Sequence, residues 1–150
     1  MSSKVTRVKR LSIVVPVLNE ARGIEQALRA LQELRRGGHE VIVVDGGSSD
    51  GSVQLAGPLA DRVLNAERGR AKQMNAGAQA ACGDVLLFLH ADSRLPQPAA
   101  QLVLEGLART GRAWGRFDVR IDGRYWLLRL VGALMNLRSR LTGVCLTVRG

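Results

Sequence analysis

Runs of apolar residues alternate along this chain with stretches in which apolar positions recur every three or four residues. Residues 11–17 (LSIVVPV) and 40–45 (EVIVVD) are continuous and rich in β-branched side chains, which is typical of strands buried on both faces of a sheet. Residues 62–65 predict a weaker strand. The five apolar residues before His90 predict a strand over 84–90 in the centre of a buried sheet.

Helical patterns fill the segments between these runs. Asn19 is a residue type favoured at helix N-caps, and apolar residues recur after it at helical spacing up to Gly37, which predicts one helix. Three further helices are expected, a short one that ends at Pro58, one over residues 71–81 and one over residues 98–110.

The alternation of strands and helices with short connections predicts an α/β fold with a mainly parallel central sheet and right-handed crossovers. A half-buried strand is also expected at residues 113–121, where apolar and polar residues alternate. Sheets of this kind bind ligands outside the carboxyl ends of their strands. The residues that follow each strand are therefore the candidates for chemistry.

The composition fits a globular chain, but the net charge is unusual. A length of 150 residues suffices for one domain with a core, and two cysteines are too few for a disulfide framework, so a reducing compartment is expected. The net charge is +9, and residues 109–150 hold nine arginines against two aspartates. Such an excess suits nucleic acid, anionic lipid or a phosphorylated substrate, and the alternative is a solvated arginine-rich surface. No nucleic-acid-binding motif accompanies it, so we expect no nucleic-acid partner.

The sequence predicts neither a secretory signal nor a membrane span. Residues 1–10 are basic without an apolar segment, which indicates a frayed tail. Residues 125–137 are apolar, but they are too few to cross a bilayer and include Arg129. We expect a cytoplasmic protein, either free or in peripheral contact with the inner face of the membrane.

Polar residues follow the first two strands. Pro16 fixes the end of the first strand, and Asn19 and Glu20 come next. Asp45 ends the second strand, and Asp50 lies in the loop after it. Each group also has a local explanation, because Asn-Glu is common before helices and Asp is common in Asx-turns. Neither Gly-x-Gly-x-x-Gly nor a P-loop motif occurs, which excludes a P-loop and disfavours a dinucleotide-dependent enzyme.

Basic residues gather before the helix that follows the third strand. Arg68, Arg70 and Lys72 lie at its entrance, where cations are unfavourable for the helix dipole, and Asn75 lies one turn inside. A bound anion such as a diphosphate would explain them. The alternative is a solvated basic face.

His90 and Asp92 follow the fourth strand. Residues two apart on a strand point to the same side, so both side chains can face one ligand. Mg²⁺ needs only one or two carboxylates when water and phosphate oxygens complete its shell, and Mn²⁺ also accepts imidazole. The alternative is a hydrogen-bonded histidine with a turn-forming aspartate before Pro96.

Together these segments resemble the nucleotide-sugar-binding half of the family 2 glycosyltransferases, which have the three-layer, Rossmann-like GT-A fold. The resemblance covers about residues 11–140 and is carried by SIVVPVLNEARGIEQALRAL, EVIVVDGGSSDGS and RGRAKQMNAGAQAACGDVLLFLHADSRLP. FLHADSRLP and WGRFDV are most similar to a short bacterial subgroup in which His replaces the first Asp of Asp-x-Asp. The implied domains are a basic tail (1–10), a nucleotide-sugar-binding domain (11–122) and an amphipathic helix with an incomplete acceptor region (123–150).

The resemblance implies a role for each candidate residue. The implied donor-binding residues are Pro16, Asn19, Glu20, Asp45 (on the base), Asp50, Arg68 (on the diphosphate) and Asn75. Asp92, with or without His90, would hold a divalent cation, Mg²⁺ or Mn²⁺, that bridges the diphosphate and stabilises the departing nucleoside diphosphate. The implied donor is a nucleotide-diphosphate sugar, a UDP-sugar first, and the acceptor is unknown.

The family also has a carboxylate general base, in a Glu-Asp motif after its fifth strand, which takes the acceptor proton as the sugar carbon inverts. After Asp92 the chain has acids only at Glu105, Asp118 and Asp122, none in that context, so no catalytic base is assigned. We therefore expect a chain truncated at its C-terminus. The hypotheses are a metal-dependent inverting transferase, a catalytically incomplete nucleotide-sugar-binding protein and, third, a basic module that binds membrane through residues 125–140.

Overall fold

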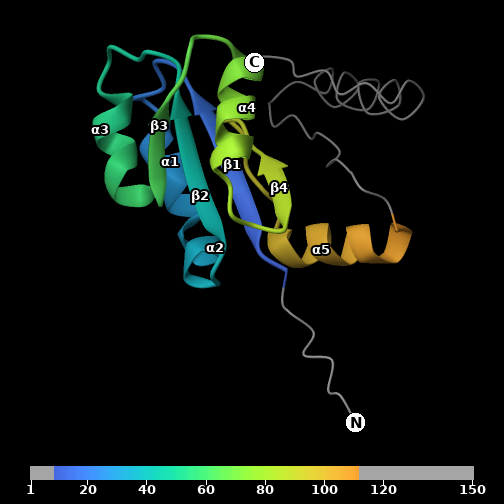
Figure 1. Cartoon of the computed structure of the whole chain (residues 1–150). Coiled ribbons are helices and arrows are strands. Elements are labelled where there is room, and N and C mark those ends of the chain that lie inside the picture. Colours follow the sequence, from blue (N-terminus) through green and yellow to red (C-terminus); the bar gives the residue numbers. More distant parts are fainter. Residues whose placement is uncertain (1–8, 112–150) are drawn as a thin grey trace, which may run out of the picture. The chain divides into compact units, whose positions relative to one another are not determined.

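The structure is a computed structural model that describes residues 9–111 (Figure 1). The chain divides into two compact units, residues 1–104 and residues 105–150, and the first contains every described strand. No helix within the described range is long and apolar enough to cross a membrane. The strand predicted at 113–121 and the boundary predicted after residue 122 lie outside the described residues.

The described strands form one parallel sheet in the order β3-β2-β1-β4 (Figure 1). The strands are β1 (Leu11–Val17), β2 (Glu40–Asp45), β3 (Arg62–Asn65) and β4 (Val85–Phe88). Each neighbouring pair is parallel, as predicted. The chain runs outward from β1 to β3 and then crosses to the other side of β1, so the topological switch point lies between β1 and β4.

Helices connect the strands. They are α1 (Ile24–Ala30), α2 (Gln32–Arg36), α3 (Ser52–Ala56) with the 3-10 helix η1 (Gly57–Leu59), α4 (Arg70–Ala80) and α5 (Ala99–Thr110). The prediction of one helix from Ile24 to Gly37 is wrong, because the helix breaks at Leu31. Leu28 O accepts hydrogen bonds from Leu31 N and from the side-chain amide of Gln32. In a continuous helix this carbonyl would instead accept from the backbone N–H of Gln32.

The core lies on both faces of the sheet, because successive residues of a strand point to opposite faces. On one face, Val14, Ile42 and Val44 are buried, with Ala76 of α4 packed against them. The larger cluster on the other face joins the strands to α1 and α3; its buried members are Leu11, Ile13, Val15, Val17, Ile24, Leu28, Leu31, Val41, Val43, Ala56, Ala60 and Leu89. The sheet therefore lies between two helical layers.

Gly77 lets helix α4 pack closely on the sheet. A Cβ atom there would lie 2.3 Å from Val14 Cγ1 and 3.1 Å from Val44 Cγ2, so only glycine fits without a shift. This close contact holds the first turn of α4, with its basic residues, against the carboxyl ends of β1 and β2.

Strand β4 differs from its prediction. It spans Val85–Phe88, and within the described part of the chain it pairs with β1 alone, at the edge of the sheet. Leu86 and Phe88 keep 42% and 40% of their surface exposed. The apolar run therefore did not indicate burial on both faces in this part of the molecule.

Candidate functional site

Pro16 ends the pairing of β1 with β4 at the carboxyl edge of the sheet. Val14 O accepts a hydrogen bond from Leu89 N, so the backbone polar groups of Val14 point towards β4. Every second residue of a strand does the same, and Pro16 is therefore the next residue of β1 that faces β4. Pro16 has no N–H to continue this ladder, and the pairing stops at Val14 and Phe88. The two strands can therefore separate at the switch point, where α/β sheets bind ligands.

The loops after β1 and β2 are joined by reciprocal hydrogen bonds. Asn19 N donates to Ser48 Oγ, and Ser49 N donates to Asn19 Oδ1, both over 2.9 Å. Asn19 adopts the left-handed conformation (φ 54°), which asparagine tolerates better than most residues. Helix α1 begins at Ile24 after an N-cap at Gly23, so Asn19 is not its cap and instead clamps the two loops.

Asp50 strengthens the same clamp. Its Oδ2 accepts from Ala21 N (2.9 Å), and its Oδ1 accepts from Ser52 N (3.1 Å) and Ser52 Oγ (2.5 Å). Ser52 Oγ in turn accepts from Glu20 N (2.8 Å). The Ser52 hydroxyl and the Ala21 N–H lower the pKa of Asp50, so its carboxylate is ionised at neutral pH.

Asp45 shapes the loop that follows it. The residue is 3% exposed, and its Oδ2 accepts from Gly47 N and Ser48 N, both over 2.9 Å. Oδ1 has only a longer bond of 3.2 Å to Ser48 N. Because a carboxylate offers about four acceptor positions, Asp45 keeps acceptor capacity for a ligand on Oδ1.

Glu20, Arg68 and Asn75 are the predicted donor-binding residues whose side chains make no hydrogen bond to another described residue. Glu20 is half-buried, and Arg68 and Asn75 are exposed. Lys72, by contrast, pairs with Glu67 at the surface. Arg68 is therefore a more available cation than Lys72 for an anionic ligand.

Arg70, the first residue of α4, lies close enough to His90 to affect it. Burial is the main cause that lowers the pKa of His90, the Arg70 guanidinium lowers it further, and the Asp92 carboxylate raises it. His90 is therefore a neutral imidazole at neutral pH, the form that binds metals. The sequence places Arg70 in the basic group, and the family resemblance assigns the diphosphate contact to Arg68. Neither indicated that the Arg70 charge acts on His90.

His90 and Asp92 lie after the end of β4 at Phe88, and not on a strand as predicted, so strand geometry does not place their side chains on one side. A cation held by both would need a ligand to complete its shell. The two residues frame a turn in which Ser93 N donates to His90 O (3.0 Å) and Ser93 Oγ to Asp92 Oδ1 (3.2 Å). Within residues 9–111, no group of three or more His, Cys, Asp or Glu side chains could hold a metal ion. Two protein ligands suit Mg²⁺ or Mn²⁺ completed by water and phosphate oxygens, and they do not suit a closed structural site.

Gln73 is a residue of this edge that the sequence patterns did not single out. Its side chain is 4% exposed on α4, and its Nε2 donates to Val17 O and Val44 O, both over 2.8 Å. Gln73 lies one turn before Gly77 on the face of α4 that packs on the sheet. A polar residue on the buried face of a helix is the signal that could have identified it.

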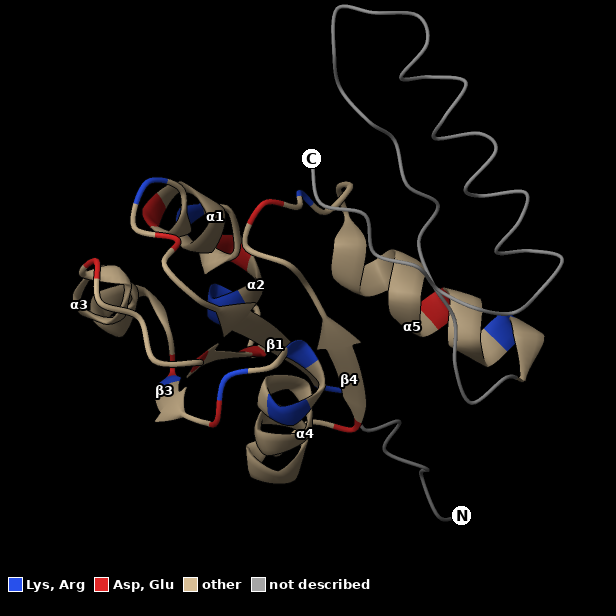
Figure 2. Cartoon of the chain, turned by 90° about the horizontal axis from the view of Figure 1, so that it is seen from above, with Lys and Arg blue, Asp and Glu red and all other residues tan. Residues whose placement is uncertain are grey.

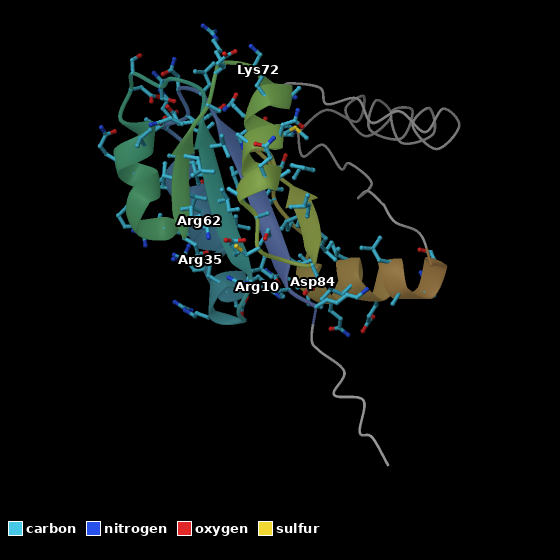
Figure 3. The ribbon with its side chains drawn as sticks, viewed as in Figure 1. Arg10, Arg35, Arg62, Lys72 and Asp84 are labelled. Atoms are coloured by element: carbon cyan, nitrogen blue, oxygen red, sulfur yellow. The ribbon has the colours of Figure 1, made fainter. Side chains whose placement is uncertain are left out.

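A second polar cluster lies at the amino end of the sheet. Figure 3 shows Arg10, Arg35, Arg62 and Asp84 at that end, far from Lys72 at the start of α4. There Glu40, which is 3% exposed, accepts hydrogen bonds from Ser12 Oγ (2.6 Å) and Cys82 N (3.0 Å). Since these groups bind one another, the cluster stabilises the start of the sheet.

Figure 2 looks onto the carboxyl edge, with basic residues on α4 and on the loop before it and acidic residues in the loops near α1 and α3. The parallel sheet and its switch point define an α/β protein in which charged groups gather at the strand ends, where folds of this kind bind ligands. The chain belongs to glycosyl transferase family 2, whose family model matches residues 12–142, and its fold is the GT-A fold. The predicted family and fold class are confirmed, whereas the individual site residues stay predictions.

Among the curated proteins that this chain is similar to are two longer transferases. It is 33% identical over 157 residues to undecaprenyl-phosphate 4-deoxy-4-formamido-L-arabinose transferase of Pseudomonas fluorescens, a match that covers 93% of this chain and 44% of that protein. It is 30% identical over 110 residues to glycosyltransferase AglE of Haloferax volcanii, covering 67% and 36%. The chain therefore spans less than half the length of these relatives.

Two solved structures share the fold. The mannosyltransferase PcManGT from Pyrobaculum calidifontis, in complex with GDP-Man and Mn²⁺, has a TM-score of 0.58 and 31% identity, with 69% of this chain and 33% of that chain covered. Glucosyl-3-phosphoglycerate synthase from Mycobacterium tuberculosis, in complex with Mn²⁺, UDP and glucosyl-3-phosphoglycerate, has a TM-score of 0.55 and 26% identity, with 68% and 39% covered.

Proposed function

We propose that this protein is a glycosyltransferase that transfers a sugar from a nucleotide-diphosphate sugar to an acceptor hydroxyl, and that residues 11–122 bind the donor. The observation that carries the proposal is the topology of a family 2 fold, in which Asp45 after β2, His90 and Asp92 after β4 and the basic start of α4 all follow the carboxyl ends of parallel strands. Both solved neighbours are complexes with Mn²⁺ and a nucleotide or nucleotide sugar. A UDP-sugar is the first donor to test.

Different residues at the carboxyl edge would bind different parts of the donor. Arg68 and Arg70 attract the diphosphate, and the free acceptor capacity of Asp45 suits an N–H group of the base. Asp92, with the neutral imidazole of His90, would hold a divalent cation, Mg²⁺ or Mn²⁺. A cation bound there neutralises diphosphate charge and so favours departure of the nucleoside diphosphate.

An inverting transfer also requires a general base near the acceptor hydroxyl. Asp45 and Asp50 use their carboxylates to bind loop N–H groups, so neither is assigned as this base. The alternative function is nucleotide-sugar binding without transfer. An assay of sugar transfer and of donor hydrolysis by the 150-residue chain separates the two candidates.

Calorimetry with UDP, with and without Mn²⁺, tests the donor site. We expect UDP to bind in the presence of Mn²⁺ and to bind about tenfold more weakly without it, which corresponds to ~1.4 kcal/mol. Asp92→Asn should weaken binding in Mn²⁺ to a similar degree. Glu33→Gln, an exposed acid of α2, is the matched control and should have no effect.

Each negative result contradicts a different part of the proposal. UDP binding that ignores both Mn²⁺ and Asp92→Asn would show that the metal assignment is wrong. No binding of UDP or GDP under any of these conditions would contradict the donor site itself.

The predicted peripheral contact with anionic membrane depends on residues 125–140, which lie outside the described residues. It stays a proposal for this protein. Flotation of the chain with anionic vesicles but not with neutral vesicles is the expected outcome, and equal recovery with both contradicts the contact.

A further inference from the structure

Gln73 joins three elements with one side chain. Its amide nitrogen carries two hydrogens, and these bond to Val17 O at the end of β1 and to Val44 O near the end of β2. Within the described residues, no other side-chain hydrogen bond links α4 to these two strand ends. The bonds are buried, so a side chain that cannot donate would leave both carbonyls without this partner.

Gly46 provides the space for this amide. A Cβ atom at Gly46 would lie 3.0 Å from both Cδ and Oε1 of Gln73 and 3.1 Å from Nε2. Gly46 N also donates to Val17 O over 2.9 Å, so this carbonyl accepts one hydrogen bond from the loop after β2 and one from the Gln73 side chain of α4. A methyl group at position 46 would therefore press on the Gln73 amide, which would have to shift by a few tenths of an ångström.

The residues next to these contacts are the proposed donor-binding groups. Val17 precedes the loop with Asn19 and Glu20, and Val44 precedes Asp45. Gln73 is itself one turn from Arg70, whose charge acts on His90. The Gln73 amide therefore sets the separation between the basic start of α4 and the loops after β1 and β2.

We propose that Gln73 is a positioning residue of the donor site, which holds the basic start of α4 in register with the two loops that receive the nucleotide. The inference rests on the proposed function, because it assigns the Gln73 contacts to the geometry of that site. It goes beyond the family resemblance, which assigns no role to this position.

Two variants alter the contact, and a third is their control. Gln73→Leu keeps a side chain of similar size but removes both hydrogen-bond donors. Gly46→Ala leaves Gln73 intact and places a methyl group against its amide. Gln79→Leu makes the same chemical change at an exposed position of the same helix and serves as the control.

Amide hydrogen exchange tests the contact without any ligand. In Gln73→Leu and in Gly46→Ala, the amides of Gly46 and Ser48 should exchange roughly tenfold faster or more, because local opening of the loop becomes easier. The amide of Val41, which donates to Asp61 at the amino end, should keep its protection. Unchanged exchange at Gly46 and Ser48 in Gln73→Leu would overturn the proposal.

Calorimetry with UDP and Mn²⁺ tests the positioning role, at a temperature where circular dichroism shows each variant to be folded. Both variants should bind UDP about tenfold more weakly than the unmutated chain, while Gln79→Leu binds normally. Faster loop exchange with unchanged UDP affinity would reduce Gln73 to a structural role and overturn the inference. No UDP binding by the unmutated chain would instead overturn the proposed function. The exchange rates of Gly46 and Ser48 would then still show whether Gln73 holds the loop in place.

A double-mutant cycle completes the test. In a Gln73→Ala background the amide is gone, so adding Gly46→Ala should cost little further affinity or protection. Effects of the two substitutions that simply add would show that Gly46 and Gln73 act independently, which contradicts the proposed contact.

Discussion

Several side chains at the carboxyl edge bind the protein's own loops. Asn19 and Asp50 clamp the loop after β1 to the loop after β2, and Asp45 binds N–H groups of its own loop. Because these groups already accept backbone hydrogen bonds, their substitution alters the shape of the edge as well as any ligand contact. Arg70, His90 and Asp92 therefore give a more direct test of ligand chemistry.

The pKa of His90 should reveal which arginine acts on it electrostatically. Since the Arg70 charge disfavours the imidazolium form and lowers the pKa, Arg70→Gln should raise the pKa of His90. Arg68→Gln should leave it unchanged. The chain has two histidines, so NMR titration of their ring protons follows both, with His90→Gln to assign the signals.

His39 is the internal control for this titration. Burial and the Arg10 charge lower the pKa of His39, and Arg70 does not contribute, so Arg70→Gln should leave it unchanged. A rise in the His90 pKa in Arg68→Gln and not in Arg70→Gln would reverse our placement of the two arginines.

Two glycines inside helices should respond to alanine in opposite directions. At Gly77 the new Cβ would lie 2.3 Å from Val14 Cγ1, and such overpacking costs about 1–3 kcal/mol, against a gain of up to ~1 kcal/mol in helix propensity. At Gly106 of α5 no atom lies within 4 Å, so only the gain remains. Urea unfolding should show that Gly77→Ala destabilises the protein and Gly106→Ala does not.

The Gly77 prediction has its own internal check. Val14→Ala removes the methyl group that the new Cβ would meet, so in the Gly77→Ala background it should cost less stability than in the unmutated chain. Equal costs in the two backgrounds would show that the approach of α4 to Val14 does not limit this position.

Hydrophobic patterns predicted every described strand and most helices, because strands β1 and β2 are buried on both faces and most helices bury a stripe of apolar residues. The break at Leu31 could not be predicted in this way, since it depends on the Gln32 side chain, which donates to Leu28 O and also to Leu59 O of a distant segment. The exposure of Phe88 was missed for a related reason. An apolar run gives the composition of a strand but not its neighbours.

The location of the site followed from topology, and its details depended on packing. Residues after four parallel strands must reach one edge, so the candidate groups at Asp45, Asp92 and the start of α4 could be predicted together. Gln73 and the role of Arg70 depend on how α4 is rotated and how closely it packs at Gly77. Neither quantity can be read from periodicity alone.

Substitutions at the amino end of the sheet should lower stability, and substitutions at the carboxyl end should weaken ligand binding. Glu40 accepts bonds from Ser12 Oγ and Cys82 N and lies 3.7 Å from Arg62 Nε, all at the amino end. Glu40→Gln keeps the shape but weakens these contacts, and hydrogen bonds to a charged group contribute about 1.5–3 kcal/mol, so Tm should fall by several degrees. Asp92 is exposed, so Asp92→Asn should leave Tm nearly unchanged.

Affinity for UDP in the presence of Mn²⁺ should depend on Asp92 more than on Glu40. Measured well below Tm, the affinity of Glu40→Gln should stay within about twofold of the unmutated chain, because distant substitutions act independently. Asp92→Asn should lose affinity while it remains fully folded. A folded Glu40→Gln chain that no longer binds UDP would show that the amino-end cluster is coupled to the donor site. Since the same strands, β1 and β2, run from one cluster to the other, they would be the elements that carry such coupling.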